Sequence, residues 1–275
     1  MQKFTLITGA SGGIGREMAF ICAEKSFNLL LVALANSNLA ELSEELRSKY
    51  AVEVNFLELD FSRIDAATDL YEWCVQNNYE VDMLINNLGI GGKEKFKDIR
   101  LDEIRQMIQL NAYVMSAITN LFLPMLNRQP RAYILNVSST ASYFNIPNKI
   151  VYSATKAYVN TFTTSLRNEL KNSHVSVSLL CHGGSTHRVD PEVEKKLNNY
   201  FTTLVHETPH AIAKAGIEGM LKNKKIILPG FPSKFYMVIS RIIPGFLADK
   251  LVRKLFVPSS PKKNYPKPIQ EMTSH

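Results

Sequence analysis

Residues 4–15 read FTLITGASGGIG, in which a short apolar run is followed directly by a turn with four glycines. The residues after this turn place apolar side chains at helical spacing, at Met18, Ala19, Ile21, Cys22 and Ala23. A glycine turn between a strand and a helix can cradle a phosphate, because the missing side chains expose the backbone and the helix N-terminus offers N–H groups. A flexible turn is the alternative, but the flanking strand and helix favour a dinucleotide site.

Strand-like and helix-like segments alternate through the rest of the first 230 residues. Apolar runs predict further strands at 28–34, 52–62, 81–89, 132–139, 175–181 and 224–230. Helical spacing predicts helices at 38–50, 63–78, 98–126, 152–171 and 209–221. This βα order predicts a Rossmann-type α/β fold, a doubly wound parallel sheet of about seven strands with helices on both faces. Ligands of such sheets bind at the carboxyl ends of the strands.

The composition favours an intracellular protein. The chain has 275 residues, 45% of them hydrophobic, which is enough for one large core. Its cysteines, Cys22, Cys74 and Cys181, are too far apart to suggest a disulfide framework or a zinc site, so we expect a reducing compartment and no metal. The N-terminus leads straight into a strand and no apolar run could span a bilayer, so we expect a cytoplasmic protein.

A second motif lies in residues 151–158, VYSATKAY. Tyr152 and Lys156 are four residues apart and share one face of a helix. A nearby cation lowers the pKa of a phenol, so the pair can serve as a general acid/base at neutral pH. A solvated helix face is the alternative for this pair on its own.

The glycine motif TGASGGIG at 8–15, combined with Tyr152 and Lys156, resembles the compact branch of the short-chain dehydrogenase/reductase superfamily. The resemblance covers residues 1–230 as the dinucleotide-binding catalytic domain. It implies an oxidoreductase that transfers a hydride reversibly between a nicotinamide cofactor and a carbonyl or secondary alcohol. In this family the tyrosine donates the proton, and the lysine lowers its pKa and anchors the nicotinamide ribose.

The resemblance also assigns two further catalytic residues. Ser139 lies thirteen residues before Tyr152, the family's usual interval, and would hold the substrate oxygen; ordinary turn chemistry is its alternative role. Asn111 would bend its helix and hold a water in a proton relay; an exposed asparagine is the alternative. The implied cofactor-binding residues are Gly9, Ser11, Gly13, Ile14, Gly15, Asp60, Phe61, Asn87, Gly89, Tyr152, Lys156 and Gly183.

Two of these assignments involve open choices. Asp60 would bind the adenine amino group together with the Phe61 N–H, or cap a helix that Ser62 opens, and both roles are compatible. The second strand ends without the acid that grips the ribose in NAD-selective proteins, so NADP(H) is favoured over NAD(H). The residues that would then contact a 2′-phosphate are Ser11, Arg16, Asn36 or Ser37.

The sequence departs from the family after the sixth strand, where residues 182–187 read HGGSTH. His182 replaces a proline, and the threonine that clamps the nicotinamide is either Thr186, one place early, or absent, with His187 in its position. The two histidines do not suggest a metal site, since no third ligand accompanies them. A non-catalytic dinucleotide-binding sensor or scaffold on the same fold is the alternative function.

The C-terminal segment carries the chain's basic charge. Residues 222–267 hold eleven lysines and arginines against one acid, in a chain of net charge +7. Residues 231–257 read as amphipathic basic helices, which would either cover the substrate pocket or lie on the inner face of a membrane. Residues 258–275 are predicted to be disordered. Aromatic residues do not interleave with the basic ones, which argues against nucleic acid.

The same resemblance supplies the expected partners. The tail resembles those of DltE-like, 3-oxoacyl and hydroxysteroid reductases, so the expected substrate is a small hydrophobic or lipid-like ketone. In the family the helix of Tyr152 packs against its copy in a partner subunit, which predicts a homodimer or homotetramer. Apolar residues on that helix, Ala157, Phe162 and Leu166, could instead belong to the core.

Overall fold

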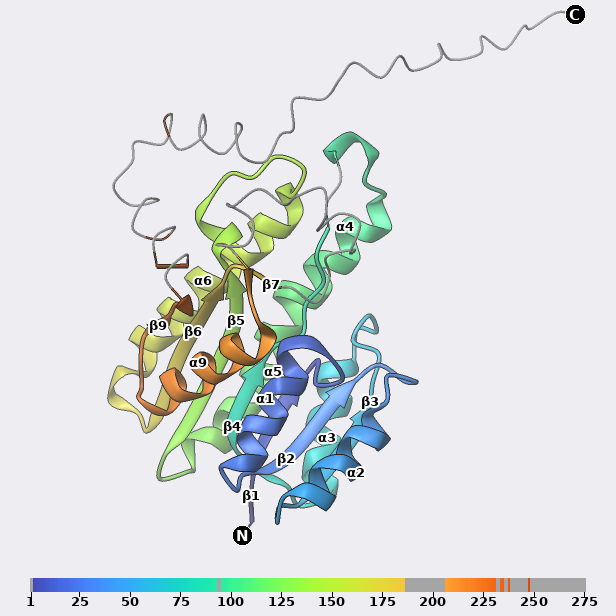
Figure 1. The fold of residues 1–275 in the computed structure, drawn as a ribbon, viewed down its shortest axis with the longest axis vertical. Coiled ribbons are helices and arrows are strands. Elements are labelled where there is room, and N and C mark those ends of the chain that lie inside the picture. Colours follow the sequence, from blue (N-terminus) through green and yellow to red (C-terminus); the bar gives the residue numbers. More distant parts are fainter. Residues whose placement is uncertain are drawn as a thin grey trace, which may run out of the picture.

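A computed structural model describes residues 2–92, 95–185 and 206–230, together with residues 233, 234, 237 and 247. Within these ranges the chain forms one seven-stranded sheet in which every neighbouring pair is parallel, in the order β3-β2-β1-β4-β5-β6-β9 (Figure 1). The strands are β1 (Lys3–Thr8), β2 (Asn28–Ala33), β3 (Val54–Glu58), β4 (Glu80–Asn86), β5 (Ala132–Ser139), β6 (Val175–His182) and β9 (Ile226–Ile227). The predicted doubly wound parallel sheet is confirmed.

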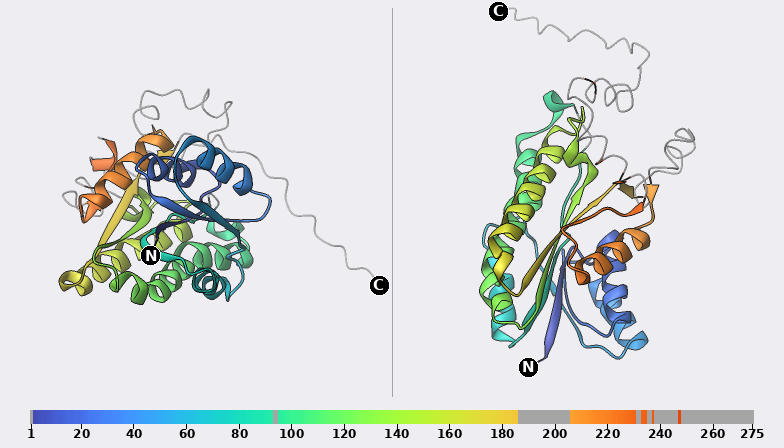
Figure 2. Two further views of the ribbon diagram at one scale, coloured as in Figure 1. Left: turned by 90° about the horizontal axis from the view of Figure 1, so that it is seen from below. Right: turned by 90° about the vertical axis from the view of Figure 1, so that its left-hand side faces the viewer.

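Helices cover both faces of the sheet, which Figure 2 shows nearly edge-on. One face packs against α1 (Gly13–Glu24), α2 (Leu39–Lys49) and α9 (Pro209–Leu221), and the other against α3 (Ala66–Gln76) and α5 (Val114–Asn127), with α6 (Ile150–Glu169) alongside. Strand β2 explains the two cores: Leu29 and Leu31 enter one, and Leu30 and Val32 the other. A strand buried on both faces is continuously apolar.

The sheet reverses its strand order at β1, which pairs with β2 on one side and β4 on the other. In sheets of this kind, chain connections leave toward opposite faces at such a point, and a crevice forms there at the carboxyl ends of the strands. These ends form the upper edge of the sheet in Figure 1. The glycine turn after β1 and the residues that follow β4 therefore lie together. This crevice is the place where the fold can hold a dinucleotide.

Several element boundaries differ from those predicted. The segment 98–126 divides into α4 (Leu101–Ile108), a π-helical turn (Gln109–Tyr113) and α5. Strand β3 ends at Glu58, β9 has only two residues, and α3 begins at Ala66 rather than at 63. Short 3₁₀ turns occur at Phe96–Asp98, Thr140–Tyr143 and Leu170–Asn172. A two-stranded sheet of β7 (Gly184–Ser185) and β8 (His206–Glu207) was not predicted.

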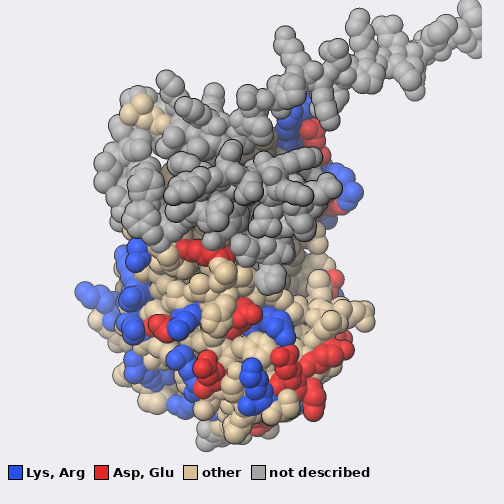
Figure 3. Space-filling model, in the orientation of Figure 1, with Lys and Arg blue, Asp and Glu red and all other residues tan. Residues whose placement is uncertain are grey.

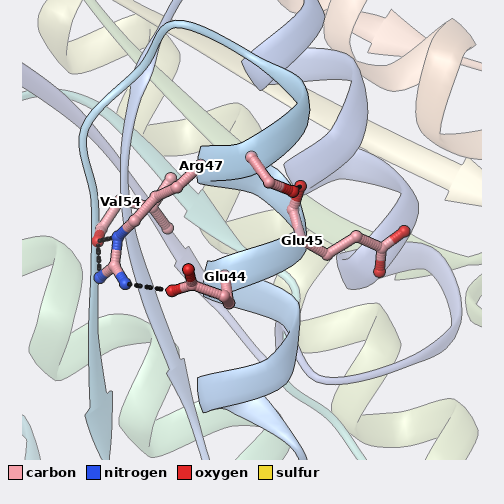
Figure 4. Close-up of polar contacts among 5 residues, drawn as sticks. Glu44, Glu45, Arg47 and Val54 are labelled. Carbon is pink, nitrogen blue, oxygen red and sulfur yellow. Dashed lines mark hydrogen bonds and ion pairs between the residues drawn. The ribbon is translucent and has the colours of Figure 1, made fainter.

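Polar contacts fasten the outer helices to the sheet. In α2, Arg47 Nε donates a hydrogen bond of 2.9 Å to Val54 O at the start of β3, and its Nη1 lies 3.5 Å from Glu44 Oε2 (Figure 4). On the face shown in Figure 3, basic and acidic side chains are interspersed over the described surface. Within the described residues no helix is long and apolar enough to cross a bilayer.

Candidate active site

The glycine turn has the geometry of a phosphate cradle. Gly9 and Gly13 have φ angles of +66° and +52°, a conformation that favours glycine. A Cβ on Gly15 would lie 2.1 Å from Gly9 O, so the turn can fold this tightly only with glycine there. A Cβ on Gly12 or Gly13 would meet no atom within 4 Å, so their backbone faces open space. The cradle therefore fits a pyrophosphate against the N-terminus of α1.

Asn87 holds this turn against the end of β4. Its Nδ2 donates hydrogen bonds of 3.0 Å to both Thr8 O and Gly9 O. Thr8 Oγ1 accepts from the backbone N–H groups of Asn87 and Leu88, at 3.1 and 3.2 Å. The prediction placed Asn87 beside the cofactor and assigned nothing to Thr8. The available signal for Thr8 was its place as the first residue of the glycine motif at a strand end.

The remaining predicted residues near the turn differ in burial. Ser11 is partly buried within the turn, and the partly buried Ile14 packs against the core cluster that includes α1. Phe61 is buried, while Asp60 is exposed and accepts a 2.8 Å bond from Ser62 N. The idea that Ser62 opens a helix is wrong, because the Asp60 carboxylate instead closes a turn of its own backbone ahead of α3.

At the end of β2 the backbone turns through left-handed Asn36 and Asn38. Asn36 N donates to Glu58 Oε1 at 3.2 Å, and Ser37 Oγ donates to Leu34 O. Arg16, at the start of α1, forms a 2.7 Å ion pair with Glu45 of α2. The Arg16 side chain is 40% exposed, and its guanidinium also lies 4.7 Å from the centre of the Phe20 ring. A surface ion pair of this kind is weak, so a bound anion can compete for the guanidinium.

Lys156 lies inside the protein, only 5% exposed. Its Nζ donates a 3.0 Å bond to Val137 O and lies 6.0 Å from the centre of the Tyr152 ring. Burial lowers the pKa of Lys156 from 10.5 to about 8, because the charged form is desolvated. The lysine thus presents a cation that is held by β5 and directed toward the tyrosine one helical turn away.

The burial of Lys156 should make the stability of the protein depend on pH. Below pH 8 the folded state must enclose a charged ammonium, which costs up to about 3 kcal/mol. The cost fades between pH 8 and 10.5, where the folded state has released a proton that the unfolded state still holds. Relative to Lys156→Met, the wild type should therefore gain stability as pH rises through this window. Urea titrations at several pH values measure this gain.

The exposed Lys222, at the end of α9, provides a matched control. Lys222→Met should keep a constant stability difference from the wild type at every pH. The same constant difference for Lys156→Met would contradict the burial of a charge.

Asn111 lies at the centre of the π-helical turn and is buried. Its Oδ1 accepts from Ile90 N at 2.8 Å, and its Nδ2 donates to Ile90 O at 2.9 Å and to Thr155 Oγ1 at 3.1 Å. The side chain thus ties the segment after β4 to helix α6. The exposed alternative for Asn111 is wrong, whereas its part in a proton relay stays a prediction.

The backbone at Gly89 lies where the two polar side chains meet. A Cβ on Gly89 would lie 3.1 Å from Asn111 Oδ1 and 3.2 Å from Lys156 Nζ. A side chain at this position would require both atoms to move by a few tenths of an ångström, so the contact is tight. The structure therefore brings Gly89, Asn111 and Lys156 together.

Ser139 ends β5 and is 6% exposed. Its Oγ accepts a 3.1 Å bond from Ala141 N, and its carbonyl accepts from Ser142 Oγ, so both groups are fixed by the Thr140–Tyr143 turn. The neighbouring Ser138 points elsewhere, because its Oγ donates a 3.1 Å hydrogen bond to Lys156 O. Tyr152 is partly buried and, like Phe144, packs against the small cluster of Ala141 and Ile146.

The profile described as short chain dehydrogenase matches residues 3–198. The chain belongs to this family. It is accordingly an oxidoreductase that acts on CH–OH or C=O groups, as the resemblance implied.

Individual relatives of this short chain dehydrogenase share about a third of their aligned residues with it or fewer. An NADP-dependent 3-hydroxy acid dehydrogenase of Schizosaccharomyces pombe is 31% identical over 84% of this chain and 93% of its own. A very-long-chain 3-oxoacyl-CoA reductase of Danio rerio is 30% identical over 62% of this chain and 54% of its own, so the chain spans about half the length of that reductase. A solved 7β-hydroxysteroid dehydrogenase structure superposes with a TM-score of 0.80 at 20% identity, covering 91% of this chain and 96% of its own, which shows the shared fold.

The altered segment after β6 is only partly described. His182 extends β6 opposite Ser139, and its Nδ1 lies 2.6 Å from Gly183 O. Burial lowers the pKa of His182 to about 4, which keeps the ring neutral. Gly183 is buried and donates its N–H to Glu207, a carboxyl that the sequence did not suggest. Thr186 and His187 lie outside the described residues, as do 258–275 and all but four residues of 231–257.

Proposed function

We propose that this short chain dehydrogenase reduces a hydrophobic 3-oxoacyl compound to its 3-hydroxy form with NADPH, reversibly. The observation that carries this proposal is the meeting of Asn111 Oδ1 and Lys156 Nζ at Gly89, one helical turn from Tyr152. A cation, a phenol and a serine at the carboxyl ends of β4 and β5 suit proton transfer to a reduced carbonyl.

The cofactor supplies the hydride when bound, and the residues of the cradle fit it. Gly12 and Gly13 would face its pyrophosphate, and Gly89 would adjoin the nicotinamide side. We assign Lys156 to its ribose and to the electrostatic lowering of the Tyr152 pKa. Tyr152 then donates a proton to the substrate oxygen. Asn111 keeps the segment after β4 in place for the cofactor and the substrate.

Ser139 would hold the substrate oxygen by its hydroxyl proton. Its Oγ already accepts from Ala141 N, so the bond in place uses a lone pair and leaves the proton to donate. A donor fixed in advance stabilises the alkoxide character of the transition state without reorganisation. This is the polar role that the thirteen-residue interval to Tyr152 predicted.

We propose that the site binds NADP(H) in preference to NAD(H). No acid ends β2, and Arg16, in the first turn of α1, is held only by a surface ion pair to Glu45 and by stacking over the Phe20 ring. The nearest carboxylate, Glu58, is bonded to Asn36 N. The fission yeast relative is NADP-dependent by name, which supports the same choice.

The substrate proposal combines two observations. Ala141, Phe144 and Ile146 form an apolar cluster against Tyr152, which suits a hydrocarbon chain beside the reacting carbonyl. Both named relatives act on compounds with oxygen at the third carbon of an acyl group, a 3-hydroxy acid in one and a 3-oxoacyl-CoA in the other. A 3-oxoacyl group is the oxidised form of a 3-hydroxyacyl group, so one reaction connects the compounds in the two names.

Direct titration with NADPH and NADH, followed by turnover of 3-oxododecanoyl-CoA, tests the proposal. We expect NADPH to bind at least about tenfold more tightly and to support turnover. Tight NADH binding would overturn the cofactor choice. Bound cofactor with no turnover of this compound, or of the free 3-oxo acid, would overturn the substrate choice.

We further propose that two chains associate through the outer face of α6. Ile150 and Tyr158 are exposed there at 50% and 45%, beside Ala157. Phe162 and Leu166 pack instead against the core, as the alternative held. Sedimentation equilibrium should give a dimer or tetramer that Ala157→Glu dissociates, whereas a monomeric wild type would refute this.

A further inference from the structure

A line of side-chain hydrogen bonds joins helix α6 to the turn that follows Ser139. Asn160 Nδ2 donates a 2.7 Å bond to Ser142 Oγ, which donates in turn to Ser139 O. Both hydrogen bonds point the same way, from the Asn160 amide through the Ser142 hydroxyl to the Ser139 carbonyl. Bonds in such a series polarise one another, so the Asn160 amide acts on the Ser139 backbone through a single hydroxyl.

The other end of the Asn160 side chain is also fixed. Its Oδ1 accepts from Cys181 Sγ at 3.6 Å, and the Tyr143 hydroxyl lies 3.5 Å from the same sulfur. Burial raises the pKa of Cys181 to about 11, so the thiol keeps its proton. The asparagine is therefore held by β6 while it holds the turn after β5, and its amide cannot rotate without losing both bonds.

Asn160 also has a defined relation to the proposed acid and base. It lies four residues after Lys156 and eight after Tyr152, so all three project from one side of α6. Tyr152 and Asn160 thus lie one turn to either side of the lysine. A rigid link from Asn160 to Ser139 fixes the serine relative to the helix that carries the other two groups.

We propose that Asn160 is a positioning residue for Ser139, acting through Ser142. The proposal rests on the proposed function, in which Ser139 holds the substrate oxygen. Asn160 itself touches neither substrate nor cofactor. Its effect is to keep the serine hydroxyl at the distance and angle that the reaction needs, and small misplacements of such groups are costly.

The decisive test compares Asn160→Leu in two backgrounds with the 3-oxododecanoyl-CoA assay. In the wild type we expect kcat to fall about tenfold, with NADPH affinity unchanged. In Ser139→Ala, itself about a hundredfold slower, we expect Asn160→Leu to cost nothing more, because its effect passes through the missing hydroxyl. An equal loss in both backgrounds, or no loss in either, overturns the proposal.

Asn160→Asp adds a pH readout that loss of packing would not give. The ionised carboxylate accepts from Ser142 Oγ and reverses the bond direction, whereas the protonated carboxyl donates as the amide does. The kcat ratio of Asn160→Asp to wild type should therefore rise as pH falls, and that of Asn160→Leu should stay flat. A flat ratio for both variants contradicts the donor role.

Amide hydrogen exchange at Ala141 separates this proposal from the proposed function. Ala141 N–H bonds to Ser139 Oγ, so its exchange should accelerate in Ser142→Ala and Asn160→Leu whether or not the acyl compound is the substrate. The control is Ser165→Ala, at an exposed position further along α6, which should change neither exchange nor kcat. Unchanged Ala141 exchange overturns the link, whereas wild-type turnover in Ser139→Ala overturns the assignment of Ser139 alone.

Discussion

Replacing Tyr152 with phenylalanine should lower kcat for ketone reduction by about 10³-fold. The change removes the one hydroxyl that the proposal assigns to proton transfer and keeps the ring that packs against Ala141 and Ile146. Protein stability and NADPH affinity should therefore stay close to wild type. Steady-state kinetics and direct NADPH titration measure the two quantities separately.

Tyr158→Phe is the matched control for this substitution. Tyr158 lies on the same helix, is 45% exposed and bonds Ser116 Oγ at 2.9 Å, away from Lys156. Its loss should leave kcat unchanged. Turnover of Tyr152→Phe at the level of Tyr158→Phe would refute the assignment of the acid.

Gly15→Ala should cost about 3 kcal/mol or more of stability and abolish NADPH binding. The new Cβ would lie 2.1 Å from Gly9 O and 2.6 Å from Asn87 Nδ2, so the cradle and the contact of Asn87 must both shift. Backbone atoms cannot move aside as a flexible side chain can. Urea unfolding and NADPH titration should show the two losses together.

Gly12→Ala provides the contrast within the same turn. Gly12 has an extended backbone with φ −159°, and a Cβ there would meet no atom within 4 Å. Stability should change by less than about 1 kcal/mol, while the methyl group intrudes on the phosphate and weakens NADPH binding. Equal stability of Gly15→Ala and Gly12→Ala would contradict the described packing.

The fold was predictable because local patterns and topology agree. Strand β2 is apolar at every position that enters either core, and FTLITGASGGIG carries its turn in its own glycines. Helical spacing alone did not predict the interruption of the 98–126 helix, although the resemblance implied a bend at Asn111. Asn111 bonds to Ile90, which is 21 residues away, and the π-helical turn occurs where that contact forms.

The site residues also divide into those that the sequence could predict and those whose roles depend on contacts formed on folding. Tyr152 and Lys156 could be paired from helical spacing, and the resemblance assigned Ser139 through its interval to Tyr152. The roles of Thr8, Ser142 and Asn160 could not be assigned, because each depends on which strand end or helix turn faces it after folding. The carboxyl of Glu207 could not be placed either, since it reaches Gly183 only across the small β7–β8 sheet.

The most direct test of the central claim follows the hydride itself. NADPH carrying deuterium at the transferable position of the nicotinamide is incubated with 3-oxododecanoyl-CoA and the protein, and the product is analysed by mass spectrometry. Our account predicts a 3-hydroxyacyl product with one deuterium on the carbinol carbon, formed about 10³-fold more slowly by Tyr152→Phe. Oxidised cofactor without labelled product, or no reaction with any 3-oxoacyl compound while NADPH is bound, would contradict it.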